Sequence, residues 1–243
     1  MMLRILKEKL VHRELLAEGS LVTFINPWSY LVMRSDPEVF RKIDVLHVDG
    51  ISLVIILRLF MGVAVRRTSF DMTSMAAEVF RICSERGLSI AFVGSEQHQI
   101  EMAVFNIHNS YPSLNIVSYR NGYFSTCEDQ NEYCRYLAST APDVVVVGMG
   151  TPRQEAFLLK IREYGWRGCG FTCGGFFHQT AKRLDYYPSL YDKLNLRWLY
   201  RIIDEPKLIS RYLIQYHLFF WLFFFDWVVL LIGKFKAFFR TAN

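Results

Sequence analysis

The sequence predicts an α/β fold, in which a parallel sheet carries helices on both faces and a helical appendage follows at the C-terminus. Short, almost wholly apolar runs alternate along the chain with segments that have the period of a helix. Strands as apolar as residues 143–150 are typical of a sheet that is covered on both faces. The last 51 residues stand apart, because they combine a positive net charge with many aromatic side chains.

Six apolar runs are the candidate strands, and helical patterns separate most of them. Such runs, bounded by turn residues, lie at 21–25, 44–48, 88–94, 114–119, 143–150 and 168–175. Helical patterns begin at residue 51 and cover 73–86, 97–109, 128–139 and 152–164. Ligands of parallel α/β sheets bind beyond the C-terminal ends of the strands. The chemistry is therefore expected after Ile25, Val48, Val93, Val147 and Thr172.

The composition excludes several classes of protein. Hydrophobic residues make up 52% and aromatic residues 16% of the 243 residues, so the chain can bury a large core and is not disordered. Residues 1–192 hold equal numbers of basic and acidic side chains, so the body offers no basic groove for nucleic acid. The five cysteines include no C-x-x-C pair, which predicts reduced thiols and no metal site. The N-terminus has scattered charges and no secretory signal, so a cytoplasmic location is expected.

The division expected from charge is a body, residues 1–195, and an appendage, residues 196–243, with a membrane-inserting segment at about 213–233. The last 51 residues contain eight basic and three acidic residues, which accounts for the whole net charge of +5. A basic and apolar segment favours a membrane surface. Asp226 would cost about 2.5–3.5 kcal/mol at mid-bilayer. A hairpin or in-plane helix in the cytoplasmic leaflet is therefore favoured over a transmembrane span, with a buried core helix as a further alternative.

Asp49 is the first candidate for catalysis, because it emerges from an apolar strand just before Gly50. A glycine there lets the backbone turn tightly or approach a ligand. The carboxylate could act as a general base or bind a sugar hydroxyl. The structural alternative is that Asp49 caps the helix that begins at Ile51.

The segment after Val147 is glycine-rich, with Gly148 and Gly150, and leads into a helix. Thr151, Pro152 and Gln154 are predicted to form a capping box, which leaves Arg153 unexplained. A glycine-rich turn before a helix N-terminus is suited to an anion. The pattern matches neither a dinucleotide fingerprint nor a Walker loop, whereas a nucleotide-sugar diphosphate is compatible with it.

Three further places carry candidate residues. Gly174 and Gly175 allow the backbone to approach a ligand, and His178 is either a ligand contact or a structural histidine. Asp71 is expected to cap a helix, and Arg66 could pair with Asp71 or with a substrate anion. Asn26 followed by proline is an ordinary turn signal when seen alone.

In this order, the motifs resemble those of the WecG/TagA/CpsF glycosyltransferases, glycosyltransferase family 26. The resemblance covers roughly residues 21–212 and is most specific where the P-x-Q-E stretch is joined to the downstream L-x-W-L-Y-R motif. Its matching points are Asn26-Pro27, Asp49-Gly50-Ile51, Arg66 with Asp71, Phe92-Val93-Gly94, Asn121-Gly122-Tyr123-Phe124, Gly148 to Glu155, Gly174-Gly175 and Leu196-Arg197-Trp198-Leu199-Tyr200-Arg201.

The resemblance implies a Rossmann-like, inverting, metal-independent transferase without a cofactor. Such an enzyme moves a sugar, of N-acetylmannosamine type or a related hexose or uronic acid, from a UDP donor to a polyprenyl-diphosphate-linked saccharide. The reaction takes place at the cytoplasmic face of the bacterial inner membrane and feeds cell-surface polysaccharide synthesis, and a homo-oligomer is possible. The resemblance makes Asp49 the general base and Gln154 an active-site residue.

The UDP diphosphate is expected to be stabilised by backbone and cations. The candidates are the backbone at 148–151 and the appendage arginines Arg197, Arg201 and Arg211. Phe24 and the stretch from Phe176 to His178 depart from the family pattern, which leaves the donor sugar open. Two other functions are considered: another Rossmann-type nucleotide-binding enzyme, and a non-catalytic membrane-surface scaffold of polysaccharide assembly.

Overall fold

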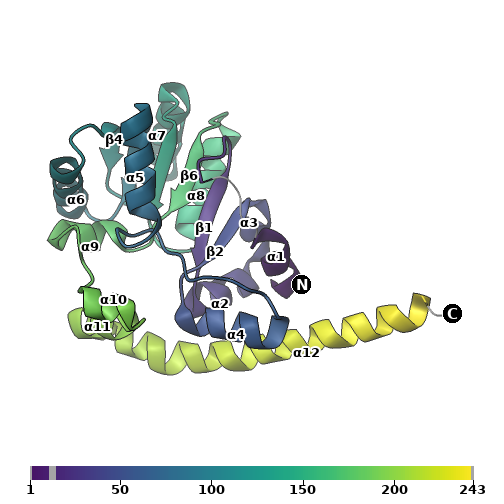
Figure 1. Cartoon of the computed structure of the whole chain (residues 1–243). Coiled ribbons are helices and arrows are strands. Elements are labelled where there is room, and N and C mark those ends of the chain that lie inside the picture. Colours follow the sequence, from purple (N-terminus) through teal and green to yellow (C-terminus); the bar gives the residue numbers. More distant parts are fainter. Residues whose placement is uncertain (1, 11–14, 242–243) are drawn as a thin grey trace.

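The computed structural model describes residues 2–10 and 15–241, except for the side chains at 189, 211 and 234–241. In this part of the chain, six parallel strands form one sheet in the order β2-β1-β6-β5-β3-β4 (Figure 1). The strands are β1 (Leu21–Ile25), β2 (Val45–Val48), β3 (Ser89–Gly94), β4 (Asn115–Arg120), β5 (Val144–Gly148) and β6 (Cys169–Thr172). The prediction of a Rossmann-like α/β fold with a parallel sheet is confirmed.

Helices cover both faces of the sheet, as the apolar strands require. Successive side chains of a strand point to opposite faces, and in β5 Val145 and Val147 join one core cluster while Val144 and Val146 join the other. The first cluster is completed by α1 (Met2–Lys9), α2 (Pro27–Ser35), α3 (Pro37–Lys42), α4 (Ile51–Met61), α7 (Cys127–Thr140) and α8 (Arg153–Glu163). The second is completed by α5 (Met75–Arg86), α6 (Gln97–Ser110) and α9 (Phe176–Lys182).

Helix starts differ from the sequence-based expectations at several places. Asn26 caps α2, because its Oδ1 accepts hydrogen bonds from the backbone nitrogens of Trp28 and Ser29. The predicted N-cap role of Asp71 is wrong, since α5 begins four residues later with Ser74 at its N-cap; the Asp71 carboxylate instead accepts from Thr73 in the preceding turn. The predicted capping box at 151–154 is also wrong, because no side chain caps α8.

From residue 189 the chain continues as a series of short helices and one long one. These are α10 (Ser189–Lys193), α11 (Arg197–Asp204), η1 (Pro206–Leu208), η2 (Arg211–Gln215) and α12 (Tyr216–Thr241). Of these, α10 still belongs to the body and α11 opens the appendage. Because α12 runs unbroken for 26 residues, the hairpin alternative is wrong, whereas the in-plane helix is compatible with this structure. Figure 1 shows α12 along the edge of the molecule where α2 and α4 lie, away from α5, α6 and α7.

Residues 206–233 are long and apolar enough to cross a membrane by length and composition. One side of this segment nevertheless packs on the body. Phe219 and Phe223 are buried against Tyr30 of α2. Asp226 accepts a hydrogen bond of 2.7 Å from the Tyr30 hydroxyl and pairs with Arg34 at 3.0 Å. The acid that looked costly for insertion thus has two partners within the protein.

Candidate active site

A cavity of about 1080 Å³ lies beyond the C-terminal ends of the strands. Its walls come from residues after β1, β2, β5 and β6 on one side and from α11, η1 and the first turns of α12 on the other. This is the location predicted from the strand ends, with one exception. The segment after β3 does not line the cavity, and Gly94 at the end of this strand packs against Gly148 of the neighbouring strand.

Asp49 follows β2 and faces the cavity. Its carboxylate does not cap α4, whose N-cap is Gly50 without a side-chain hydrogen bond. Loss of hydration, reinforced by the negative charge of Asp71, raises the pKa of Asp49 from 3.8 to about 7, against the opposing effect of Arg67, Arg197 and Arg201. A carboxylate with a pKa near neutrality is suited to remove a proton from a hydroxyl group.

Gln154 lies in the first turn of α8 and joins the segments that follow β5 and β6. Its Nε2 donates to the Thr151 hydroxyl at 3.2 Å and to Oε1 of Glu155 at 3.1 Å. Its Oε1 accepts from the backbone nitrogen of Gly174 at 3.1 Å. The carboxamide therefore holds the Gly174 turn in place at the cavity wall.

Glu155 is the buried support of this arrangement, with no exposed surface. Its Oε1 also accepts from the hydroxyls of Thr23 at 2.7 Å and Thr151 at 2.9 Å. Burial raises the pKa of the Glu155 carboxyl, and these hydrogen bonds oppose the rise. Thr151 lies one residue before Pro152, the N-cap of α8, and its hydroxyl oxygen accepts from Nε2 of Gln154 and not from a backbone nitrogen of the helix.

Arg201 of α11 reaches the turn after β6 from the appendage. A Cβ atom placed at Gly175 would lie 3.3 Å from the Arg201 guanidinium, so a side chain there would crowd this approach. Arg201 pairs with Glu205 at 3.3 Å, and its Nε is buried with no hydrogen-bond partner among the described residues. Arg153, which also lines the cavity, has no ion pair in the described part of the chain. Both guanidinium groups can serve an anion.

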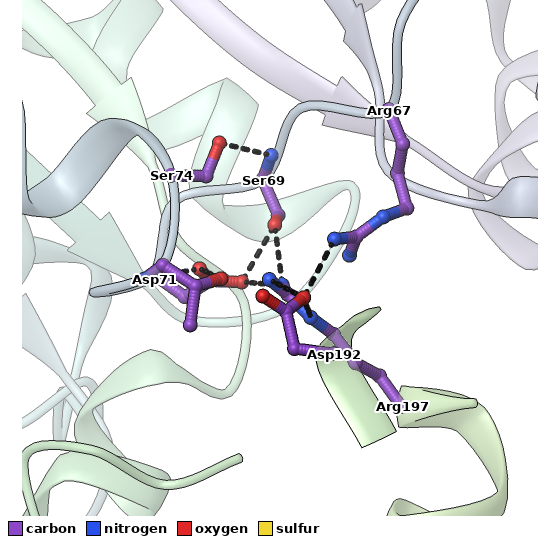
Figure 2. Close-up of polar contacts among 7 residues, drawn as sticks. Arg67, Ser69, Asp71, Ser74, Asp192 and Arg197 are labelled. Atoms are coloured by element: carbon purple, nitrogen blue, oxygen red, sulfur yellow. Dashed lines mark hydrogen bonds and ion pairs between the residues drawn. The ribbon is translucent and has the colours of Figure 1, made fainter. Parts of the chain in front are cut away.

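Arg197 has a different task, which Figure 2 shows. Its guanidinium lies between Asp71 of the body, at 2.5 Å, and Asp192 of α10, also at 2.5 Å. Asp192 in turn pairs with Arg67 at 3.1 Å, and the Ser69 hydroxyl donates to Asp71. Arg197 is 7% exposed. These four charged side chains, here called the latch, fasten the appendage to the body beside Asp49.

Most residues predicted for the site are brought together, but not all. Those that line the cavity are Asn26, Asp49, Asp71, Gly150, Thr151, Arg153, Gln154, Gly174, Gly175, Arg197 and Arg201. Gly94, Gly148, Arg66 and His178 do not line it: the two glycines pack against one another, Arg66 is exposed on the outside, and His178 lies 3.8 Å from Glu205. The side chain of Arg211 lies outside the described residues.

Sequence reasoning missed four residues of the site. Arg67, not Arg66, faces the cavity, because the backbone there is extended and pairs with Val48, so neighbouring side chains point to opposite sides. Glu155 accepts a hydrogen bond from Gln154, and Asp192 belongs to the latch. The centre of the Tyr187 ring lies 4.9 Å from the Cζ atom of Arg197. For Arg67, the sequence signal was that two arginines are adjacent in an extended segment, where only one of them can face the cavity. The others depend on contacts distant in sequence.

The remaining titratable groups offer no competing centre in the part of the chain that is described. No three His, Cys, Asp or Glu side chains there are placed to hold a metal ion. The five cysteines are unpaired, and burial raises the pKa of the thiols of Cys83 and Cys169 to about 12. These thiols are therefore protonated at neutral pH.

Comparison with known proteins shows the family of this chain. The model of the "Glycosyl transferase WecG/TagA/CpsF family" matches residues 5–231. A UDP-Gal:alpha-D-GlcNAc-diphosphoundecaprenol beta-1,4-galactosyltransferase of Shigella boydii is 35% identical, over 80% of this chain and 81% of that protein. Two N-acetylglucosaminyldiphosphoundecaprenol N-acetyl-beta-D-mannosaminyltransferases are also similar. That of Bacillus spizizenii is 25% identical over 78% of this chain and 73% of its own, and that of Bacillus subtilis 26% over 77% and 73%.

The family model covers most of the chain, and the cavity, the carboxylate after β2 and the P-x-Q-E stretch lie within the matched range. The chain belongs to the WecG/TagA/CpsF family and is a glycosyltransferase.

Proposed function

We propose that this enzyme transfers a hexose, with inversion, from a UDP-sugar to an N-acetylglucosamine carried on a polyprenyl diphosphate, with Asp49 as the general base. The proposal depends mainly on the Asp49 carboxylate, which faces a large cavity and has its pKa raised to about 7. The relatives' names support the acceptor, because all three contain N-acetylglucosamine linked through diphosphate to undecaprenol.

Inversion follows from a single in-line attack. The bond between the sugar carbon and UDP is α in common UDP-hexoses, and the relatives' names specify β products. A hydroxyl of the acceptor attacks the anomeric carbon from the opposite face while Asp49 takes its proton. The new carbon–oxygen bond forms as the bond to UDP breaks, so one base suffices and no covalent enzyme intermediate is needed.

The leaving UDP gains negative charge, which must be stabilised in the transition state. Arg201 and Arg153 are the cations of the cavity best placed for this role, and the backbone around Gly174 and Gly175 can approach the phosphates closely. Arg197 acts indirectly in this proposal. Its charge is already met by Asp71 and Asp192, so it holds α11 and Arg201 in position.

The donor sugar is proposed to be UDP-galactose or a closely related UDP-hexose. The galactosyltransferase relative is more similar in sequence than the two N-acetylmannosaminyltransferases. Phe24 and Phe176 line the cavity, where they reduce the room and the hydrogen-bonding capacity for polar substituents. UDP-N-acetylmannosamine and UDP-linked uronic acids are the alternatives to test.

A donor screen tests the proposal. The purified protein is given each UDP-sugar together with a short-chain lipid-diphosphate-N-acetylglucosamine in detergent, and UDP release is measured. We expect acceptor-dependent release with one donor and its loss in Asp49→Asn. Absence of release with every donor would favour a non-catalytic scaffold, and full activity of Asp49→Asn would refute the assignment of the base.

A further inference from the structure

We propose that α4, a helix of the body, forms a membrane-binding surface together with α12, so that the protein lies on an anionic bilayer with α12 in the plane of the membrane. The proposal deepens the proposed function, because a lipid-linked acceptor must be met at such a surface. The appendage alone was expected to contact the membrane from sequence. The structure adds a second helix, nearly 170 residues earlier in the chain.

The two helices are in direct contact. The Trp227 indole nitrogen of α12 donates a hydrogen bond of 2.7 Å to the backbone oxygen of Phe60 in α4. The Phe60 ring also packs against the rings of Phe223, Phe224 and Trp227. Figure 1 shows both helices along the same edge of the molecule. They therefore form one continuous surface.

The solvent-exposed side of this surface carries large apolar side chains. In α4, Ile55 and Leu59 lie one helical turn apart on the exposed side, and Leu59 is 75% exposed. In α12, Trp221 is 75% exposed, and further exposed apolar side chains lie along the same helix, namely Leu218, Phe220, Phe224, Phe225, Val229, Leu231 and Ile232. Large exposed apolar residues on two helices that contact one another indicate an interaction site.

Charge identifies the partner as an anionic lipid surface. Residues 51–70 contain no acidic residue and three arginines, of which Arg58 and Arg66 are exposed. Residues 206–243 contain a single acid, Asp226, and this is paired with Arg34 inside the protein. Apolar residues bordered by arginines match a bilayer whose headgroups carry negative charge. Arg66, which lies outside the cavity, has a role in this arrangement.

The docking of α12 determines its orientation. Phe219, Phe223, Asp226 and Trp227 fix the side of the helix that faces the body over two turns. If α12 crossed the bilayer, α2, α4 and the Asp226–Arg34 pair would have to enter the hydrocarbon with it, which is costly for charged groups. An in-plane helix keeps these contacts and buries only the exposed apolar side.

The same surface adjoins the cavity. Ile51 and Ser52 of the first turn of α4 line the cavity, as do Tyr216, His217 and Phe220 at the start of α12. Binding through α4 and α12 would thus bring the mouth of the cavity to the membrane. A diphosphate-linked sugar could reach Asp49 while its polyprenyl chain stays in the bilayer.

The test is co-sedimentation with vesicles of phosphatidylethanolamine and phosphatidylglycerol, without donor or acceptor. Leu59→Glu in α4 and Trp221→Glu in α12 should each weaken vesicle binding by roughly tenfold or more, the effect of losing one buried large apolar side chain. Phe105→Glu is the matched control, because Phe105 is 59% exposed on α6 and lies outside the surface. It should bind as the wild type does. Vesicles of phosphatidylcholine alone should bind more weakly.

Wild-type binding by Leu59→Glu, with loss in Trp221→Glu, would overturn the proposal and leave α12 as the sole membrane contact. Equal losses in all three variants would show unspecific weakening and would also overturn it. UDP release with the short-chain acceptor in detergent separates this inference from the proposed function. Leu59→Glu should keep that activity, and a wild type that lacks it would contradict the function while leaving the vesicle result valid.

Discussion

Replacement of Asp49 by asparagine should abolish transfer and stabilise the protein, and the stabilisation should depend on pH. An acid whose pKa rises on folding weakens the fold as the pH rises, because the unfolded chain loses its proton first. For Asp49 this occurs between its ordinary pKa of 3.8 and about 7 in the folded protein. The full difference corresponds to at most about 4 kcal/mol. Asparagine has a similar shape and does not titrate.

The assay is urea or thermal unfolding of wild type and Asp49→Asn at pH 5 and at pH 8. At pH 8 the wild type bears the whole cost of the charged, partly buried carboxylate, whereas at pH 5 it bears less than half. The advantage of the variant should therefore grow by about 2–3 kcal/mol from pH 5 to pH 8, or several degrees in Tm for a chain of this size. Exposed Asp36 provides the control variant Asp36→Asn. An advantage that is equal at both pH values would refute the reasoning.

The remaining predictions concern the supports of the site and the appendage. Glu155→Gln should reduce kcat by about tenfold or more, because it removes the charged acceptor that holds Gln154; steady-state kinetics with unchanged kcat would contradict this. Asp71→Asn should destabilise the protein by about 3 kcal/mol, since it leaves Arg197 buried with one charge partner fewer, and unfolding curves that coincide with wild type would count against the latch. Asp226→Ala should loosen α12 from the body, which limited proteolysis would detect as faster cleavage before this helix; an unchanged rate would contradict the docking. EDTA should leave the transfer rate unchanged if arginines alone balance the charge of UDP, and a rate lost with EDTA and restored by Mg²⁺ would contradict that.

Much of the fold could be predicted because the strands are unusually apolar. The run Val144 to Val147, followed by glycines, predicts a buried strand. In a parallel sheet, Asp49 and Gln154 then lie at the same edge, because both follow the C-terminal ends of strands. The ends of the strands therefore predict where the cavity lies. The order of the strands could not be predicted, because every strand in such a sheet has a similar pattern.

The wrong predictions concern side chains whose partners are distant in sequence. Asp71 has the sequence context of an N-cap, but its carboxylate binds Arg197, which lies 126 residues later in the chain. Asp226 would be costly in a bilayer as an unpaired charge, but Tyr30 and Arg34 are its partners within the protein. Local sequence contains no record of contacts made across 100 residues or more. The latch and the docking of α12 were therefore visible only in the structure.

The central claim is one-step inverting transfer to a lipid-diphosphate N-acetylglucosamine by a base after β2. The configuration of the product at the new glycosidic carbon tests it most directly. The purified enzyme is given the donor selected by the screen and the short-chain acceptor, and the product is analysed by NMR. Starting from an α-linked UDP-hexose, the account predicts a β-glycosidic product formed by the wild type and none formed by Asp49→Asn. An α-linked product, or a β-linked product from the variant at the wild-type rate, would contradict it.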